Sequence, residues 1–222
     1  MKMTSLDLNG KNIPVSIWDV LVVGTGCAGY GAADRLYQYG LRDIAIVTDD
    51  RLAGTSRNTG SDKQTYYKLT LSGDTPDSVR DMAETYFAGQ CMDGEHALCE
   101  AALSAGCFLR LCDLGVPFPR NRFGEYVGYK TDHDPRSRAT SVGPLTSRRM
   151  TEALEKSVLS KNIPILDRHM VIAILKDGIS DLLVDKNNAG EYYVNYLSDD
   201  TRLKLQTTYP LLSEENIYLF PR

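Results

Sequence analysis

The sequence predicts an α/β fold built around a parallel sheet, and three neighbouring segments near its start support this. The run "DVLVV" (19–23) is continuously apolar and rich in Val, which is typical of a strand buried on both faces. A helical pattern follows over 28–39, and a second apolar run, "IAIV" (44–47), comes next. A strand, a helix and another strand in this order favour parallel pairing of the two strands.

The helix predicted over 28–39 ends at Gly40, a residue suited to the left-handed backbone of a helix C-terminus. Its core-facing side is expected to consist of Ala32, Ala33, Leu36 and Tyr39. A further helix is expected from Thr75-Pro76 to about Ala88, because a capping hydroxyl there precedes a proline at the first helical position.

Two more helices and several strands complete the expected fold. Asp93 is expected to cap a helix that ends at Gly115, and another helix is expected at about 146–160. Residues 50–75 and 116–145 are expected to be loop. "ILDRHMVIAIL" (165–175) has strand character, and "DLLVD" and "EYYVNYL", separated by "KNNAG", are typical of a hairpin.

The predicted domain organisation has three parts. Residues 1–16 form an N-terminal arm, with a short hairpin around Asn9-Gly10. Residues 17–193 form the main domain, with a helical and loop insertion at about 75–160, and residues 194–222 form a divergent tail.

Composition narrows the class of protein. The chain has 222 residues, 42% of them hydrophobic, which suffices for one substantial core or two small ones. A formal net charge of −4 gives no reason to expect nucleic-acid binding. No run approaches the roughly 20 apolar residues of a membrane span. The polar N-terminus lacks the apolar core of a signal peptide, so a cytoplasmic location is expected.

The five cysteines match no C-x-x-C spacing and are expected to be reduced thiols, mostly buried. Cys99 and Cys107 recur at helical spacing with three leucines, which favours the core over ligation. Those leucines are Leu98, Leu111 and Leu114.

A glycine-rich turn joins the first predicted strand to the first helix. Gly24, Gly26 and Gly29 satisfy G-x-G-x-x-G in a Rossmann-like context. The first permits the tight turn, the second lets the backbone approach a pyrophosphate, and the third lets helix and strand pack closely. Cys27 and Ala28 open the helix, whose free N–H groups and partial positive charge attract an anion. We therefore expect these five residues to bind a dinucleotide.

An acidic residue is expected at the end of the second strand, where it would bind ribose hydroxyl groups. Asp49 lies 20 positions after Gly29 and is the first candidate, with Asp50 as an alternative source of the carboxylate. Thr48 occupies the position that the strand register favours for the carboxylate, and it is the second candidate.

The string "DVLVVGTGCAGYGAADRLYQYG" resembles the N-terminal signature of FAD-dependent flavoproteins. Further on, "LAGTSRNTGSDKQ" (52–64) resembles the loop after the second strand in the flavoprotein subunits of succinate dehydrogenase and fumarate reductase, and in L-aspartate oxidase. Residues 136–166 and "ILDRHMVIAILKDG" resemble later segments of the same family. The resemblance covers roughly residues 17–190.

This resemblance implies an FAD-binding domain of an oxidoreductase that moves hydride between a small-molecule substrate and flavin N5, with an electron-transfer partner subunit. The strand at Val171 would meet the adenine through its backbone. No histidine stands where some members attach flavin, so FAD is expected to be non-covalent. The loop residues implied to lie at the flavin side are Thr55, Ser56, Asn58, Thr59, Gly60 and Ser61.

The chain also departs from the family's pattern. The later strand ending in Ala-Thr-Gly-Gly is missing, as are the capping domain and the family's catalytic residues. We therefore expect the N-terminal part of a larger flavoprotein, with a fold incomplete at its C-terminus and catalytic residues unknown. Two alternatives remain open: an NAD(P)-binding oxidoreductase domain, and a non-catalytic fragment of a flavoprotein.

Two other groups of residues invite functional hypotheses. His133 lies between Asp132 and Asp134, where carboxylates would suit it to proton transfer unless the loop is simply solvated. No H-x-H or H-x-x-x-H pair exists, so no metal site is expected. A group of arginines would bind an anionic substrate or a nucleic acid, or pair with neighbouring acids. They are Arg120, Arg122, Arg136, Arg138, Arg148 and Arg149.

Overall fold

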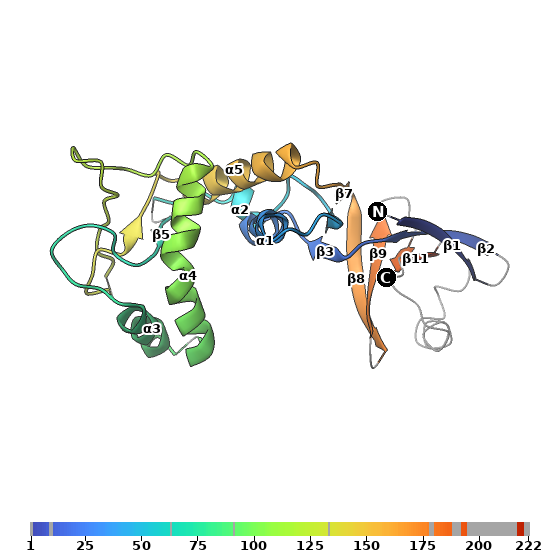
Figure 1. The fold of residues 1–222 in the computed structure, drawn as a ribbon, viewed down its shortest axis with the longest axis horizontal. Helices are drawn as coiled ribbons and strands as arrows, with labels where there is room; N and C mark the ends of the chain where they lie inside the picture. The colour runs from blue at the N-terminus through green and yellow to red at the C-terminus, as the bar shows by residue number, and fades with distance from the viewer. Residues whose placement is uncertain are drawn as a thin grey trace. The chain divides into compact units, whose positions relative to one another are not determined.

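The computed structural model divides the chain into two compact units (Figure 1). Unit 1 comprises Met1–Thr55 and Glu155–Arg222, and unit 2 comprises Ser56–Leu154. The residues that the structure describes are 2–8, 11–62, 64–90, 92–132, 134–177, 180–187, 192–194 and 217–219.

A three-stranded parallel sheet forms the centre of unit 1. Strand β3 (Val20–Val23) leads through helix α1 (Cys27–Gln38) to strand β4 (Ile44–Thr48), and β4 pairs in parallel with both β3 and β7 (Ile165–Asp167). The order β3-β4-β7 places β4 in the middle. The parallel pairing predicted from the first two apolar runs is therefore confirmed.

The expected burial of the first strand on both faces is wrong. Within the described residues, β3 is an edge strand, and its Val23 side chain is 53% exposed. Full burial instead applies to β4, whose five residues are all buried. The two apolar runs look alike in sequence, but only the central strand has a paired neighbour on each side.

Helix α1 buries Ala33 as expected, but the rest of its buried face differs from the predicted one. Its buried residues are Gly29, Tyr30, Ala33 and Asp34, whereas Ala32 and Tyr39 are exposed. The apolar spacing was misleading because the close contact at Gly29, described below, sets how the helix is rotated. The helix end agrees with expectation: Gly40 has φ +94°, and the Leu41 N–H donates to the Leu36 carbonyl at 3.2 Å.

The segment 165–175 forms two strands where one was expected. Strand β7 ends at Asp167, and β8 (His169–Asp177) begins after Arg168, whose φ of +64° turns the chain sharply. Strand β7 joins the parallel sheet, while β8 joins a separate four-stranded sheet. One left-handed residue therefore divides the segment between two sheets.

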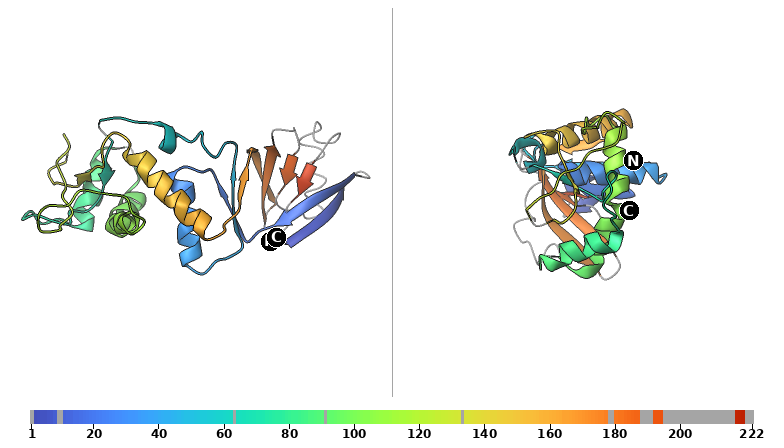
Figure 2. Two further views of the ribbon diagram at one scale, coloured as in Figure 1. Left: turned by 90° about the horizontal axis from the view of Figure 1, so that it is seen from above. Right: turned by 90° about the vertical axis from the view of Figure 1, so that its left-hand side faces the viewer.

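The four-stranded sheet confirms the predicted hairpin and extends it. Strands β9 (Ser180–Asn187) and β10 (Tyr192–Val194) pair antiparallel, and β9 also pairs antiparallel with β8. Strand β11 (Ile217–Leu219) pairs parallel with β10 (Figure 2). The N-terminal arm forms the expected hairpin, in which β1 (Lys2–Leu8) pairs with β2 (Lys11–Ile17).

In unit 2, helix α3 (Val79–Ala88) packs beside helix α4 (Gly94–Asp113) (Figure 1). Helix α3 begins three residues later than expected, because Ser78 caps it by accepting a hydrogen bond from the Asp81 N–H. Asp93 caps α4 as expected, by accepting hydrogen bonds from the N–H groups of Glu95 and His96.

Three shorter or shared elements complete the described chain. Helix α2 (Thr55–Asn58) and the antiparallel pair β5 (Tyr66–Tyr67) and β6 (Ala139–Thr140) lie within segments expected to be loop. Helix α5 (Thr146–Ser160) matches its expected position, and the boundary between the units falls inside it.

The core face of α4 agrees with the prediction at Leu111 but not at most of the other predicted positions. Cys99 and Cys107 are exposed, and Leu98 is 51% exposed. Cys27 and Cys112 are only partly buried, so among the described cysteines the expectation of mostly buried thiols is wrong. Apolar residues recur at helical spacing on more than one face of α4, so periodicity alone does not select the core face. The buried residues are Ala97, Ala101, Ser104, Phe108 and Leu111.

Phe108 is the centre of an aromatic cluster in unit 2. Its side chain is fully buried, and its ring centroid lies 4.7 Å from that of Phe118 and 5.0 Å from that of Tyr126. Tyr66 completes the cluster at 5.7 Å. These contacts connect α4 to β5 and to the chain that follows α4.

We predict that Phe108→Ala lowers the free energy of unfolding by about 3–5 kcal/mol, because it leaves a cavity in this cluster. Leu103→Ala is the matched control, since Leu103 lies on the same helix and is 61% exposed. The control is expected to change stability by about 0.5 kcal/mol or less. Urea denaturation followed by circular dichroism measures both, and equal losses would contradict the assigned core face.

Candidate functional site

The predicted glycine loop is a tight turn between β3 and α1. Gly24 has φ +94°, a backbone conformation that favours glycine, and its N–H donates to the Val47 carbonyl at 2.7 Å. An added Cβ at Gly29 would lie 1.9 Å from the Gly24 carbonyl oxygen, so only glycine fits there. Two of the three glycines thus hold the start of α1 directly against the end of β3.

The N-terminus of α1 has the features of an anion site. Gly26 is the N-cap, and the described structure shows no side-chain hydrogen bond at this cap. The first N–H groups of any helix lack partners within the helix, and they carry partial positive charge. Because the first turn of α1 contains no acidic residue, nothing there opposes the approach of a phosphate.

A hydroxyl pair fastens the glycine loop to the end of β4. Thr25 is 3% exposed, and its Oγ1 lies 3.0 Å from Oγ1 of Thr48. Thr48 therefore forms a hydrogen bond within the protein, and this bond holds the glycine loop at the end of β4. Thr25 could not be identified from the sequence, because the x positions of G-x-G-x-x-G carry no fixed residue type.

The chain after β4 returns to the glycine loop. An added Cβ at Gly54 would lie 3.9 Å from the backbone nitrogen of Gly26 and 3.9 Å from the carbonyl oxygen of Thr25. The backbone at Gly54 therefore lies beside the anion site, within unit 1. The predicted polar loop therefore begins, at Leu52–Gly54, beside the glycine loop.

The ends of β4 and β7 together carry a group of charged residues. Asp49 is exposed, and the Arg168 guanidinium binds Asp50 with NH1 3.0 Å from Oδ2. Oδ1 of Asp167 accepts hydrogen bonds from the backbone N–H of Arg51 at 2.8 Å and from that of Arg168 at 3.0 Å. The ribose candidate Asp49 thus lies in a segment that Asp167 holds in place.

The Arg51 side chain is held by helix α5. Its Nε lies 2.7 Å from Oε1 of Glu155, and the Tyr30 hydroxyl donates to the same oxygen at 3.0 Å. Burial and the neighbouring Glu155 raise the pKa of Tyr30 to about 12, so Tyr30 stays a hydrogen-bond donor at neutral pH. The Tyr30–Glu155–Arg51 group connects α1, α5 and the segment after β4, all within unit 1.

The remaining predicted flavin-side residues lie around α2. Thr55 closes the first stretch of unit 1, and the others belong to unit 2. The Ser61 N–H donates to the Pro144 carbonyl at 2.9 Å, and a Cβ at Gly60 would lie 3.1 Å from Leu145 Cδ2. The exposed members of the set are Thr55, Asn58, Thr59, Gly60 and Ser61, and Ser56 is half-buried.

Val171 is half-buried in β8 and pairs with Asp185 of β9. Its backbone therefore contributes to the four-stranded sheet. The structure does not place it in the parallel sheet that carries the glycine loop.

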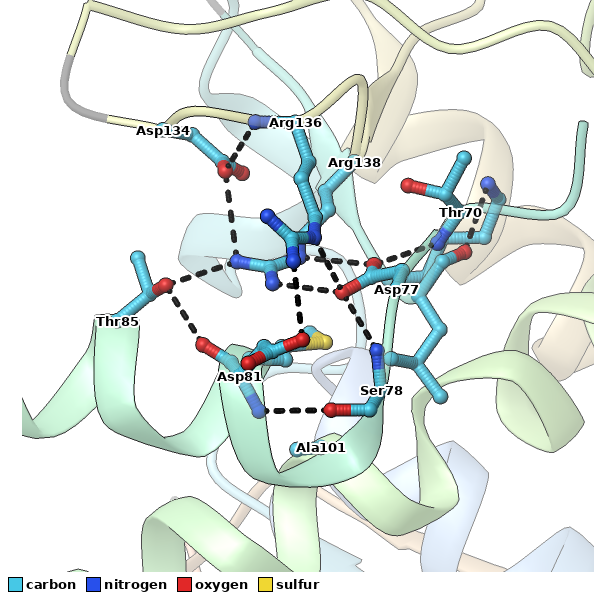
Figure 3. Close-up of polar contacts among 12 residues, drawn as sticks. Thr70, Asp77, Ser78, Asp81, Thr85, Ala101, Asp134, Arg136 and Arg138 are labelled. Atoms are coloured by element: carbon cyan, nitrogen blue, oxygen red, sulfur yellow. Dashed lines mark hydrogen bonds and ion pairs between the residues drawn. The ribbon is translucent and has the colours of Figure 1, made fainter. Parts of the chain in front are cut away.

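Unit 2 contains a buried ionic cluster that two of the predicted arginines form (Figure 3). Arg138 is fully buried and binds both carboxylate oxygens of Asp77, with Nε 3.0 Å from Oδ2 and NH2 2.7 Å from Oδ1. Its NH1 also donates to Thr85 at 2.9 Å and to Asp134 at 3.3 Å. Arg136 completes the cluster with NH2 2.9 Å from Asp81 Oδ2.

These contacts decide among the hypotheses for the arginine group. Arg148 and Arg149 lie 2.9 Å and 3.9 Å from carboxylate oxygens of Glu152, so these two also pair with an acid. Arg120 and Arg122 stack on aromatic rings. The structure therefore favours pairing with neighbouring groups over an anionic-substrate or nucleic-acid site.

The histidines form no metal centre in the described part of the chain, where no group of three or more potential ligands occurs. His96 is exposed beside Asp93, and Nδ1 of His169 lies 2.6 Å from the Asp167 carbonyl. His133 and its predicted proton transfer fall outside the described residues. Across the same described residues, no helix has the length and apolar character needed to cross a membrane.

The Gly29 contact predicts that alanine substitutions at two glycines of α1 differ markedly in their effect on stability. Gly29→Ala is expected to destabilise unit 1 by about 1–3 kcal/mol, because the methyl group overlaps the Gly24 carbonyl. Gly31→Ala is the control, because a Cβ there meets nothing within 4 Å. It should stabilise the helix by up to about 1 kcal/mol. Thermal unfolding measures both, and a tolerated Gly29→Ala would refute the close packing.

The buried cluster predicts a loss of stability in acid. Burial of Asp77 opposes its ionisation, but hydrogen bonds from Arg138 and two backbone N–H groups outweigh burial and lower its pKa to about 2. Since the usual value is 3.8, the folded state favours ionised Asp77 by on the order of 2 kcal/mol. This contribution is complete above about pH 4 and is lost as the pH falls towards 2.

The free energy of unfolding, measured by denaturation between pH 2 and about 6, tests this expectation. Asp77→Asn should flatten the acid limb, whereas Asp74→Asn, at an exposed carboxylate, should leave it intact. An acid limb unchanged in Asp77→Asn would contradict the assignment.

Comparison with known proteins identifies one matching family and several solved structures with a similar fold. Residues 19–197 match the family described as the FAD binding domain. Mycobacterium smegmatis Sdh1 in complex with UQ1 superposes with a TM-score of 0.70 at 17% identity, over 80% of this chain and 32% of Sdh1. E. coli quinol fumarate reductase FrdA superposes with a TM-score of 0.65 at 19% identity, over 78% of this chain and 30% of FrdA.

A flavocytochrome c3 fumarate reductase superposes with a TM-score of 0.65 at 17% identity, over 90% of this chain and 37% of that protein. At these identities the likeness establishes a shared fold. The chain spans about a third of the length of these solved structures. A direct sequence comparison with characterised proteins finds no match.

Proposed function

The chain belongs to the FAD-binding domain family, and from this premise we propose that it holds FAD non-covalently as the cofactor domain of an oxidoreductase. The expected α/β FAD-binding fold with a central parallel sheet is confirmed by the family match and the shared folds. Oxidoreductase activity is proposed because proteins of similar fold are fumarate reductases.

The close packing of the glycine loop is the observation that carries this proposal. Gly29 lies so near the Gly24 carbonyl that a methyl group does not fit, and this contact aligns the α1 N-terminus with the end of β3. Backbone N–H groups of Gly26, Cys27 and Ala28 would then face the pyrophosphate. The described residues therefore fit the phosphate part of the cofactor.

Other residues would bind the rest of the cofactor. Asp49 would accept hydrogen bonds from the ribose, with the Thr25–Thr48 pair fixing the strand end that carries it. The loop from Thr55 to Ser61 would supply hydroxyl and backbone groups to the flavin, and the backbone at Val171 would meet the adenine. Attachment is proposed to be non-covalent because positions 55–61 contain no histidine.

When bound, FAD would supply hydride transfer at flavin N5, and the protein would hold and orient it. We propose that substrate-binding and catalytic groups belong to parts that the solved relatives have and this chain does not match. A small-molecule substrate and an electron-transfer partner subunit are proposed on the same basis. An NAD(P)-binding domain is the alternative, and the FAD family match argues against it.

We predict that the purified chain takes up FAD and absorbs at about 450 nm when FAD is bound. Gly26→Val should abolish this binding, because the side chain would occupy the place of the pyrophosphate. Gly31→Ala is the control. Gly31 lies in the same helix, and a Cβ there would meet nothing within 4 Å, so this variant should bind FAD normally. Titration with FAD and with NAD, followed by absorbance and calorimetry, measures the outcome.

Three results would count against the proposal. Uptake of NAD without FAD would favour the alternative. Binding of neither would support a non-catalytic fragment. Unchanged FAD affinity in Gly26→Val would refute the glycine loop as the pyrophosphate site.

A further inference from the structure

A short hairpin in unit 2 carries the most exposed large apolar side chain in the described part of the chain. Residues 119–127 fold back on themselves, and Arg120 is bridged antiparallel to Tyr126. Phe123 lies at the tip of this hairpin and is 72% exposed. Because a phenylalanine side chain has no polar atom, its transfer from water to an apolar medium is favourable.

Hydrogen bonds fix the tip of the 119–127 hairpin. Oδ1 of Asn121 accepts hydrogen bonds from the N–H groups of Phe123 at 2.9 Å and Glu125 at 3.1 Å. The Asn121 N–H donates to the Glu125 carbonyl at 2.9 Å, and the Gly124 N–H donates to the Asn121 carbonyl at 3.0 Å. Gly124 has φ +84°, a conformation that glycine adopts readily. The backbone that carries the exposed ring is therefore ordered before any partner binds.

The base of the hairpin is anchored in the core of unit 2. The ring centroid of Tyr126 lies 5.0 Å from that of the fully buried Phe108. The Tyr126 carbonyl also accepts a hydrogen bond from Ser72 Oγ at 2.8 Å. Because the tip is fixed to a packed core, moving Phe123 into an apolar medium would order few additional groups and would cost little conformational entropy.

Two arginines give the hairpin a positive charge. The guanidinium carbon of Arg122 lies 4.7 Å from the ring centroid of Phe123, and that of Arg120 lies 4.1 Å from the ring centroid of Tyr126. The 119–127 hairpin contains one acidic residue, Glu125, so its formal charge is +1 on a chain whose net charge is −4. Exposed charges more than about 8 Å apart are largely screened at physiological salt. An anionic surface that touches the hairpin is therefore attracted by its arginines more than it is repelled by distant acidic residues.

The size of the apolar tip indicates the kind of partner. A buried aromatic side chain removes about 150–250 Å² from water. A specific protein–protein interface buries about 1,200 Å² or more, so one ring on a narrow turn falls well short of it. A lipid bilayer requires no such area, because apolar side chains of peripheral proteins enter its interface by roughly 5–10 Å while basic side chains attract anionic headgroups. The observations therefore favour a lipid surface over a protein.

We propose that the 119–127 hairpin attaches the protein to an anionic lipid bilayer. Phe123 inserts at the boundary between headgroups and acyl chains, and the charges of Arg120 and Arg122 attract the lipid phosphate groups. The attachment is weak and reversible, because it rests on one ring and two charges. The inference goes beyond the proposed function and does not depend on it, since no residue of the glycine loop takes part.

The test measures binding of the full chain to lipid vesicles by co-sedimentation. Vesicles of phosphatidylcholine alone are compared with vesicles of phosphatidylcholine and phosphatidylserine in about equal amounts, and the wild type should bind the second kind more tightly. Phe123→Ala should weaken that binding by at least about fivefold, because it removes the inserted ring. Circular dichroism checks that each variant is folded.

Tyr39→Ala is the matched control for Phe123→Ala. Tyr39 is 68% exposed, and its ring centroid lies 4.7 Å from the guanidinium carbon of Arg35, but it belongs to unit 1 and not to the hairpin. The control therefore removes an equally exposed ring with an equally close arginine. It should bind phosphatidylserine vesicles as the wild type does.

A fluorescent variant separates insertion from adsorption by charge alone. Phe123→Trp should keep vesicle binding, and its emission should shift to shorter wavelength with phosphatidylserine vesicles, because the indole ring enters a less polar medium. The wild type has one tryptophan, Trp18, which lies outside the hairpin, so its emission should not shift.

Four results would overturn the proposal. The wild type does not bind phosphatidylserine vesicles, or Phe123→Ala and Tyr39→Ala lose binding equally. The emission of vesicle-bound Phe123→Trp does not shift, which would exclude insertion. The chain associates with itself in analytical ultracentrifugation without lipid, and Phe123→Ala abolishes this association, which would assign the tip to a second copy of the chain. None of these results depends on whether the chain binds FAD, so failure of the proposed function leaves the test intact.

Discussion

The arrangement of unit 1 depends on one contact, the approach of Gly29 to the Gly24 carbonyl. Because no side chain separates them, α1 starts directly at the end of β3, and the rotation of the helix is fixed. That rotation directs Tyr30 towards Glu155 and buries Asp34, whose Oδ1 accepts a hydrogen bond from Ser157 at 2.6 Å. The contact that shapes the proposed phosphate site thus also determines how α1 is joined to α5.

Local signals in the sequence predicted the order of elements well. Apolar runs, the glycines of the turn, Asp93 and Gly40 all specify structure through their nearest neighbours. Core faces were predicted less well, because α1 and α4 carry apolar residues on more than one side. In α1 the buried face even includes a carboxylate, Asp34, whose Oδ1 binds Ser157 and Lys161 far along the chain.

In the candidate site, too, local features could be predicted from the sequence and long-range contacts could not. Its glycines have a spacing with a direct physical meaning, so sequence identified them. Thr25, Arg51 and Glu155 were missed, because their roles arise from partners between 23 and 125 positions away. Arg136 and Arg138 were noticed as charges, but only the fold shows that both pair with Asp77. Long-range ion pairs leave no periodic signal in a single sequence.

The division of unit 1 into two stretches has a consequence for the order of folding. Pairing of β4 with β7 must close a loop that contains all of unit 2, which carries an entropic cost before any strand contact forms. Unit 2 brings its own ends together, since the Ser61 N–H binds the Pro144 carbonyl and Gln64 binds Ser147. Completion of the parallel sheet should therefore follow the folding of unit 2, and the proposed nucleotide site should be among the last features to form.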